Sequence, residues 1–272
     1  MKLLYLLPLF VFSACSTASM PNDMGGMSDQ SEDMDTGSET FCRDGVYYVN
    51  SITLPTRVNG MQGDTVGFDL DGAASSCGID DWADNVDNSF LNFVSAAQLE
   101  VRRELSESTC LTPSGSLPLD LRITVSGACS QVAIEHAFSA TSPVIFVVTE
   151  NNGAIFANDT GETLNFPIMY DSTDVALPIV NLSFSAQING STMNNIILGG
   201  TLLPDDLDAF AEDYVTASLV NNCPENCSQA ILDRYFEVIA LLDEHYDLNA
   251  CGAMSIGLLA TASQSEVTRR CQ

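Results

Sequence analysis

Positive charge is scarce in this sequence, and its absence excludes several functions. The 272 residues include 9 lysines and arginines against 36 aspartates and glutamates, a formal net charge of −27. The only lysine is Lys2, so the rest of the chain offers neither a Schiff-base lysine nor a phosphate loop of the GxxxxGK[ST] type. Such a polyanion repels nucleic acid, and the composition therefore predicts no nucleic-acid partner.

Residues typical of catalysis are also few. The chain has two histidines, His136 and His245, and contains no GxSxG, HExxH or CxxC motif. No catalytic residue can be named from these patterns. An extracytoplasmic hydrolase with an unidentified carboxylate site remains an alternative, because any acidic protein offers carboxylate pairs. The favoured hypothesis is a binding or structural module.

The N-terminus predicts export. Lys2 precedes an apolar run of ten residues, Leu3 to Phe12. This run is shorter than the about 20 residues that span a bilayer and fits a signal peptide. The following residues, Phe12-Ser13-Ala14-Cys15, resemble the lipobox of bacterial lipoproteins, in which the peptide is cut before the cysteine and the cysteine is acylated. The alternative is an ordinary secretory signal with an incidental cysteine.

Six aspartates crowd residues 67–88, GFDLDGAASSCGIDDWADNVDN. Like charges at this density need water, backbone N–H groups or a cation around them. The segment is not an EF-hand, because alanine stands at the position of the required glycine. Its DxDG and DNVDN elements resemble the calcium loops of thrombospondin type 3 repeats. Two hypotheses stay open for this segment, a turn-and-cap structure with solvated acids and a calcium site. The candidate calcium ligands are Asp69, Asp71, Asp80, Asp81, Asp84 and Asp87.

The lipobox, the acidic tether and the GFDLDG-type loop together resemble uncharacterised outer-membrane or surface lipoproteins of environmental Gram-negative bacteria. The resemblance implies a lipid-anchored, exported protein at the outer membrane or cell surface. Serine after the cysteine implies the outer membrane in that family. The membrane is then a partner through the lipid, and a protein or glycan partner is left open. The expected divisions are a signal peptide (1–14), a lipidated cysteine and disordered tether (15–40), a β-rich domain (41–203) and a helical segment packed on it (204–272).

Cysteine usage agrees with export. Of nine cysteines, Cys15 is the lipidation candidate, and the remaining eight predict four disulfides. We expect two pairs inside the β-rich part and two that staple the C-terminal part. The first group is Cys42, Cys77, Cys110 and Cys129; the second is Cys223, Cys227, Cys251 and Cys271.

Hydrophobic patterning predicts a mainly β fold with α additions, an antiparallel sandwich or barrel-like core. The expected strands are 46–54, 64–71, 119–125, 131–138, 144–148, 153–157, 164–170, 182–189 and 196–203. The unbroken apolar run 144–148 predicts a central strand buried on both sides. Helices are expected at 89–105, after the acidic loop, and at 204–215 and 231–246, with a short third one at 253–263.

Overall fold

The computed structural model describes residues 42–53, 65–82, 85–97, 104–106, 121–136, 142–170, 173–220, 228–242 and 244–264. The chain divides into two compact units, Met1–Ser38 and Glu39–Gln272, and every described residue belongs to the second. The predicted signal peptide, Cys15 and the tether therefore lie outside the described residues. Among the described residues, no helix is both long enough and apolar enough to cross a membrane.

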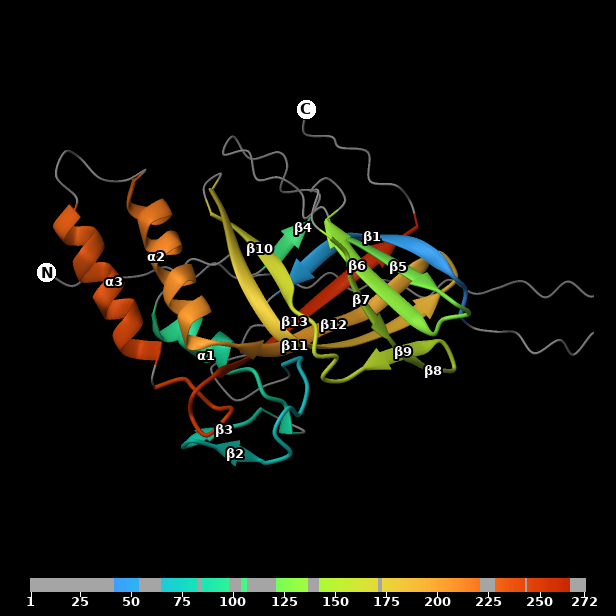
Figure 1. Cartoon of the computed structure of the whole chain (residues 1–272), viewed down its shortest axis with the longest axis horizontal. Coiled ribbons are helices and arrows are strands. Elements are labelled where there is room, and N and C mark those ends of the chain that lie inside the picture. The colour runs from blue at the N-terminus through green and yellow to red at the C-terminus, as the bar shows by residue number, and fades with distance from the viewer. Residues whose placement is uncertain are drawn as a thin grey trace, which may run out of the picture. The chain divides into compact units, whose positions relative to one another are not determined.

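One large antiparallel sheet forms the body of the second unit (Figure 1). Its strand order is β7-β6-β5-β1-β13-β12-β11-β9-β8, with β10 paired to β11 and β4 paired to β1. The strands are β1 Gly45–Thr53, β4 Glu104–Ser106, β5 Leu121–Ser126, β6 Gln131–His136, β7 Val144–Val147, β8 Thr149–Asn151, β9 Ala154–Ala157, β10 Leu164–Tyr170, β11 Thr173–Asn189, β12 Thr192–Leu202 and β13 Met254–Ser263. A separate small hairpin joins β2 Ser75–Ser76 to β3 Ile79–Asp80.

The sheet curls into a nearly closed, barrel-like body. β7 and β8 lie at opposite ends of the strand order, yet only Val148 separates them along the chain. One stretch of backbone therefore joins both ends of the sheet, pairing first with β6 and then with β9. The predicted mainly β, antiparallel, barrel-like fold is confirmed.

Side chains that alternate along the strands fill the interior, as period-two patterning predicts. In β5, Leu121, Ile123 and Val125 are buried and the residues between them are half-buried. Tyr47 of β1 and Phe184 of β11 are among the largest fully buried side chains. Full burial of a leucine, isoleucine or phenylalanine contributes about 1.5–3 kcal/mol, so apolar burial is the main force that holds the sheet closed.

Three helices pack together beside the sheet (Figure 1). They are α1 Ser89–Ala96, α2 Pro204–Val220 and α3 Ser228–Leu242. α2 begins at Pro204, where the helix expected at 204–215 begins, and the two acids in its first turn favour a helix start. The ring of Phe90 in α1 lies 6.2 Å from that of Phe210 in α2, and Arg234 of α3 donates to the carbonyl oxygen of Ala97 after α1.

The C-terminal part corrects the prediction of a purely helical segment at 204–272. The expected short helix at 253–263 is instead β13, which lies in the middle of the sheet between β1 and β12. Its first five residues are all buried. A short, largely apolar run carries too little periodicity to distinguish a buried helix from a buried strand, which explains the error.

Three other element predictions are corrected. The helix expected at 89–105 ends at Ala96, and Glu104–Ser106 is a strand paired with β1. The strand expected at 64–71 is reduced, within its described residues, to a single bridge at Phe68. The run 144–148 forms β7, but β7 ends the strand order and exposes Ile145 and Val147. An apolar run is buried on both sides only where neighbouring elements cover it, which periodicity does not report.

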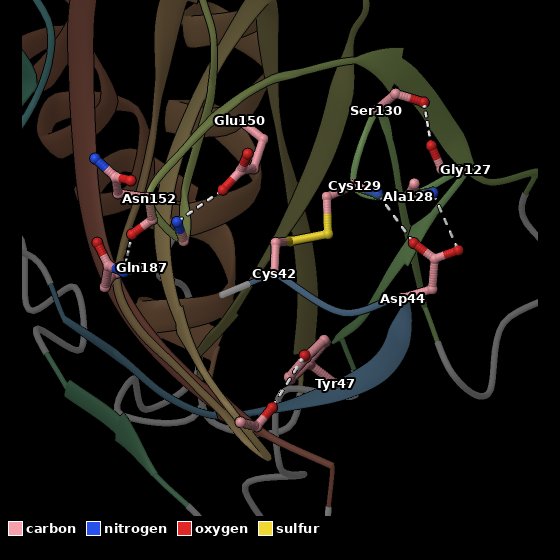
Figure 2. Close-up of a disulfide and its surroundings, with 12 residues drawn as sticks. Cys42, Asp44, Tyr47, Gly127, Ala128, Cys129, Ser130, Glu150, Asn152 and Gln187 are labelled. Carbon is pink, nitrogen blue, oxygen red and sulfur yellow. Dashed lines mark hydrogen bonds between the residues drawn. A yellow bond between two sulfur atoms is a disulfide. The ribbon is translucent and has the colours of Figure 1, made fainter. Parts of the chain in front are cut away.

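Two disulfides lie in the described part of the chain. Cys42, just before β1, pairs with Cys129 in the turn between β5 and β6 (Figure 2). Asp44 supports this turn by accepting the N–H groups of Ala128 over 3.2 Å and Cys129 over 3.0 Å. This pair agrees with the prediction for the β-rich part.

The second disulfide corrects the predicted grouping. Cys77 of the acidic loop pairs with Cys251, which we expected to pair within the C-terminal part. The other four candidates, Cys110, Cys223, Cys227 and Cys271, lie outside the described residues.

Gly257 in β13 tests how closely the start of the acidic loop is docked on the sheet. A Cβ atom added there would lie 2.1 Å from the Val66 carbonyl oxygen and 2.7 Å from Gly67 Cα. Backbone atoms cannot rotate away as a flexible side chain can, so we expect Gly257→Ala to lower the free energy of unfolding by about 1–3 kcal/mol. Urea unfolding of the purified protein measures the change. Gly252→Ala is the matched control, because its Cβ would come no closer than 3.4 Å to the Asn249 carbonyl oxygen; equal losses in both variants would contradict the close docking.

Candidate metal centre

The acidic loop, residues 67–88, closes on itself at its base. An isolated antiparallel bridge pairs Phe68 with Asp87, and the Asp87 N–H donates to the Phe68 carbonyl oxygen over 2.9 Å. A second bridge pairs Trp82 with Val86. Along the chain, the β2–β3 hairpin lies between Phe68 and Trp82, and Figure 1 labels its two strands. Backbone pairing therefore sets the path of this polar segment.

Closing the loop brings three carboxylates together. One ligand oxygen from each of Asp69, Asp71 and Asp87 lies within 4.8 Å of the others. Asp69 also accepts the Gly72 N–H over 2.7 Å, and Asp71 accepts the Ala73 N–H over 2.8 Å. The two exposed carboxylates are thus held in place by their own loop backbone beside Asp87.

Asp87 is the buried member of this trio, with 1% of its surface exposed. Its Oδ2 atom accepts the Leu70 N–H over 2.5 Å. Its Oδ1 atom is also buried, and no hydrogen-bond donor among the described residues satisfies it. A buried, ionised carboxylate oxygen is costly unless a donor or a positive charge compensates it. Asp87 therefore requires a proton or a cation at Oδ1.

The raised pKa values of two aspartates in the loop also indicate a need for a proton or a cation. Burial raises the pKa of Asp87 to about 7; the Leu70 hydrogen bond acts against this shift, and the charges of Asp81, Asp71 and Asp247 add to it. Burial also raises the pKa of Asp81, whose carboxyl interacts with that of Asp87. Neighbouring carboxylates resist joint ionisation, so near neutral pH the cluster is poised between binding a proton and binding a cation.

A buried polar network attaches the loop to β13. The Asn88 side-chain amide donates to the carbonyl oxygen of Gly257 over 3.1 Å. The Ser89 N–H donates to Ser255 Oγ over 2.8 Å, so Ser255 takes the part that a local N-cap side chain usually plays. Asn88 stands at the N-cap position of α1, but its side chain makes no capping bond. The Ser255 hydroxyl in turn donates to Asp247 Oδ2 over 2.5 Å.

The Cys77–Cys251 disulfide is a second attachment, made at the turn of the β2–β3 hairpin. It joins residues 174 positions apart in the sequence. Cys251 lies between Asp247 and Ser255, so the covalent link and the polar network reach the loop from the same segment. The loop is held both at its base and at its outer turn.

The donor set fits a hard divalent cation such as Ca²⁺. Calcium binds about six to eight oxygen atoms from carboxylates, carbonyls and water. The three clustered carboxylates supply part of such a shell, and a cation there would compensate the buried Asp87 Oδ1 atom. Catalysis by Asp87 is not favoured, because at 1% exposure a substrate has no access to it.

Three of the six predicted ligands converge. Asp69, Asp71 and Asp87 form the cluster, and Asp81 acts on it through its charge. Asp80 is exposed on β3 and is not part of the cluster. Asp84 lies outside the described residues.

Sequence reasoning missed the residues that position the site, namely Ser89, Asp247 and Ser255. Ser89 and Ser255 are 166 residues apart, and serine and aspartate at such positions carry no local signal. Only the two cysteines hinted at the link, because an exported chain with an even number of them predicts disulfides without predicting their partners.

Comparisons with known proteins assign this chain to no family. No family model matches the chain, and neither the curated proteins nor the solved structures include a significant match. The function is therefore argued from the residues themselves.

Asp87 predicts a pH dependence of stability. Its pKa in the folded protein is about 7, above the ordinary 3.8, so the folded state keeps a proton that the unfolded chain releases between these values. The resulting stabilisation is fully present below about pH 4 and is lost as the pH rises through about 7. We expect the melting temperature of chelator-treated protein to fall between about pH 5 and 8, and Asp87→Asn to flatten that fall.

The control is Asp80→Asn, which changes an exposed aspartate outside the cluster and should leave the pH profile unchanged. Some slope should remain in Asp87→Asn, because burial raises the pKa of Asp81 and Asp247 as well. Identical profiles for the parent and Asp87→Asn would show that Asp87 is not the titrating group.

Proposed function

We propose that the protein is a membrane-anchored extracytoplasmic lipoprotein whose folded unit is a binding or structural module stabilised by calcium. The observation that carries the calcium part is Asp87 Oδ1, a buried carboxylate oxygen without a donor among the described residues, set beside two further carboxylates. The role assigned to the metal is structural, because the carboxylate that most needs it is closed to solvent.

The anchoring part rests on the sequence. Leu3 to Phe12 has the length of a signal peptide, and Cys15 stands where the lipidated cysteine of bacterial lipoproteins stands. Several acyl chains on one cysteine bind a membrane durably, whereas one chain binds only marginally. Ser16 favours the outer membrane or cell surface, with residues 16–40 as the tether.

Calcium would add to stability by binding the folded state alone. Extracellular calcium sites typically have dissociation constants of about 10⁻⁴ to 10⁻³ M. A hundredfold excess of free calcium over the dissociation constant stabilises the folded state by about 2.7 kcal/mol. For a folded unit of this size that corresponds to a rise of about 5–10 °C in melting temperature.

Removal of two ligands tests the metal centre. Asp69→Asn combined with Asp71→Asn should abolish the rise in melting temperature at about 10 mM calcium, since neutral amides bind a hard cation more weakly than carboxylates. Trp82, the only tryptophan, lies in the same loop and is buried, so its fluorescence should titrate with calcium in the parent alone.

Two controls separate calcium from charge screening. Sodium chloride of matched ionic strength should stabilise the parent and the double variant alike, and Asp80→Asn should retain the full response to calcium. If the double variant responded to calcium as the parent does, the acidic loop would be a solvated turn.

Replacement of the anchor cysteine tests the location. Cys15→Ser removes the thiol that would carry the acyl chains, so the variant should leave the membrane fraction. Fractionation of expressing Gram-negative cells, with metabolic labelling by a palmitate analogue, measures both effects. A Cys15→Ser protein that stayed in the membrane fraction would overturn the lipoprotein assignment without bearing on calcium.

A further inference from the structure

The edge strand β7 is unusual in what it exposes. β6 is its only partner among the described strands, so no described strand pairs with the backbone groups of its other edge. Ile145 and Val147 on its outer face are 45% and 75% exposed. Natural edge strands are usually protected by charges, prolines or a covering segment, and Val144–Val147 contains neither a charge nor a proline.

A hollow lies beside this edge, at the seam where the sheet closes. The pairing of β8 with β9 ends at Thr149 and Phe156, whereas β9 pairs with β11 along its whole length and β7 pairs with β6. The hollow beside this end of the pairing measures about 530 Å³. Exposed Ile145, Val147 and Phe156 line it together with polar residues.

The charge around this hollow, which we call the seam groove, has one sign. Glu162 lines it, and the exposed Asp159 lies in the same turn, between lining residues. None of the described residues that line it is basic. Arg122 on β5, which is two strands from β7, forms an ion pair with Glu135 at 2.7 Å.

The charge and the exposed apolar side chains of the seam groove indicate which kind of ligand it can bind. A second copy of this chain, at a formal net charge of −27, and the acidic tether would both be repelled. An extended segment with alternating apolar side chains could pair with the free edge of β7, place those side chains against Ile145, Val147 and Phe156, and bring cations to Glu162 and Asp159.

We propose that the seam groove binds an extended, cationic peptide segment of a partner protein, which adds as a strand along β7. The apolar residues supply the affinity, and the acidic rim selects lysine or arginine. The groove shares no residue with the metal centre, so this binding does not depend on calcium.

The test uses a fluorescein-labelled peptide, Lys-Val-Thr-Val-Lys-Val-Thr-Val-Lys, and the full folded protein. Fluorescence anisotropy should show binding, and the same peptide with glutamate in place of lysine should bind at least about tenfold more weakly. Val147→Lys should weaken binding of the lysine peptide by about tenfold or more, since it removes apolar contact and adds repulsion. Val147→Ile should keep the affinity.

Phe236→Ser is the matched control and should leave binding of the lysine peptide unchanged. Phe236 is also an exposed apolar side chain, 62% accessible, but it lies on α3, away from the groove lining. Asp159→Asn with Glu162→Gln, which leaves β7 unchanged, should weaken binding of the lysine peptide even if Val147→Lys fails to fold. Equal binding of both peptides, no binding of either, or no effect of the Asp159 and Glu162 changes would overturn the proposal. Concentration-dependent dimers that Val147→Lys abolishes would assign the groove to a second copy instead.

Discussion

The attachment of the acidic loop to β13 is the constraint on which the rest of the structure depends. Gly257 allows the loop backbone to approach the strand, Asn88 binds the Gly257 carbonyl oxygen, and Ser255 accepts the first N–H of α1. β13 also lies between β1 and β12, in the middle of the sheet. One strand therefore fixes the base of the loop, the start of a helix and the centre of the sheet.

Two buried aspartates near this attachment show why only one of them is a ligand candidate. Asp247 and Asp87 are 2% and 1% exposed, and burial raises the pKa of both. Asp247 is satisfied by the backbone N–H and the hydroxyl of Ser255. Asp87 has the Leu70 N–H at one oxygen and no donor at the other. Equal burial with unequal satisfaction places the need for a proton or a cation at Asp87.

Both proposed sites arise where regular strand pairing stops. The metal centre lies in a loop whose strand character is limited to two isolated bridges and a short hairpin, so backbone N–H groups are free to hold carboxylates. The seam groove lies where the pairing of β8 with β9 ends, between β7 and the end of β9. The first site gathers charge and the second exposes apolar surface, so mutations can separate a stabilising ion from a recognition surface.

The sequence by itself determined the features that depend on neighbouring residues. Alternation placed β5, β6 and the C-terminal half of β11, Pro204 and the acids after it favoured the start of α2, and aspartate density marked the loop. The sequence misassigned two largely apolar runs, because whether such a run becomes an exposed edge like β7 or a central strand like β13 depends on what covers it. Only the tertiary structure decided which aspartates converge and that Cys77 joins Cys251, because contacts across 174 residues are set by the closure of the whole sheet and leave no local pattern.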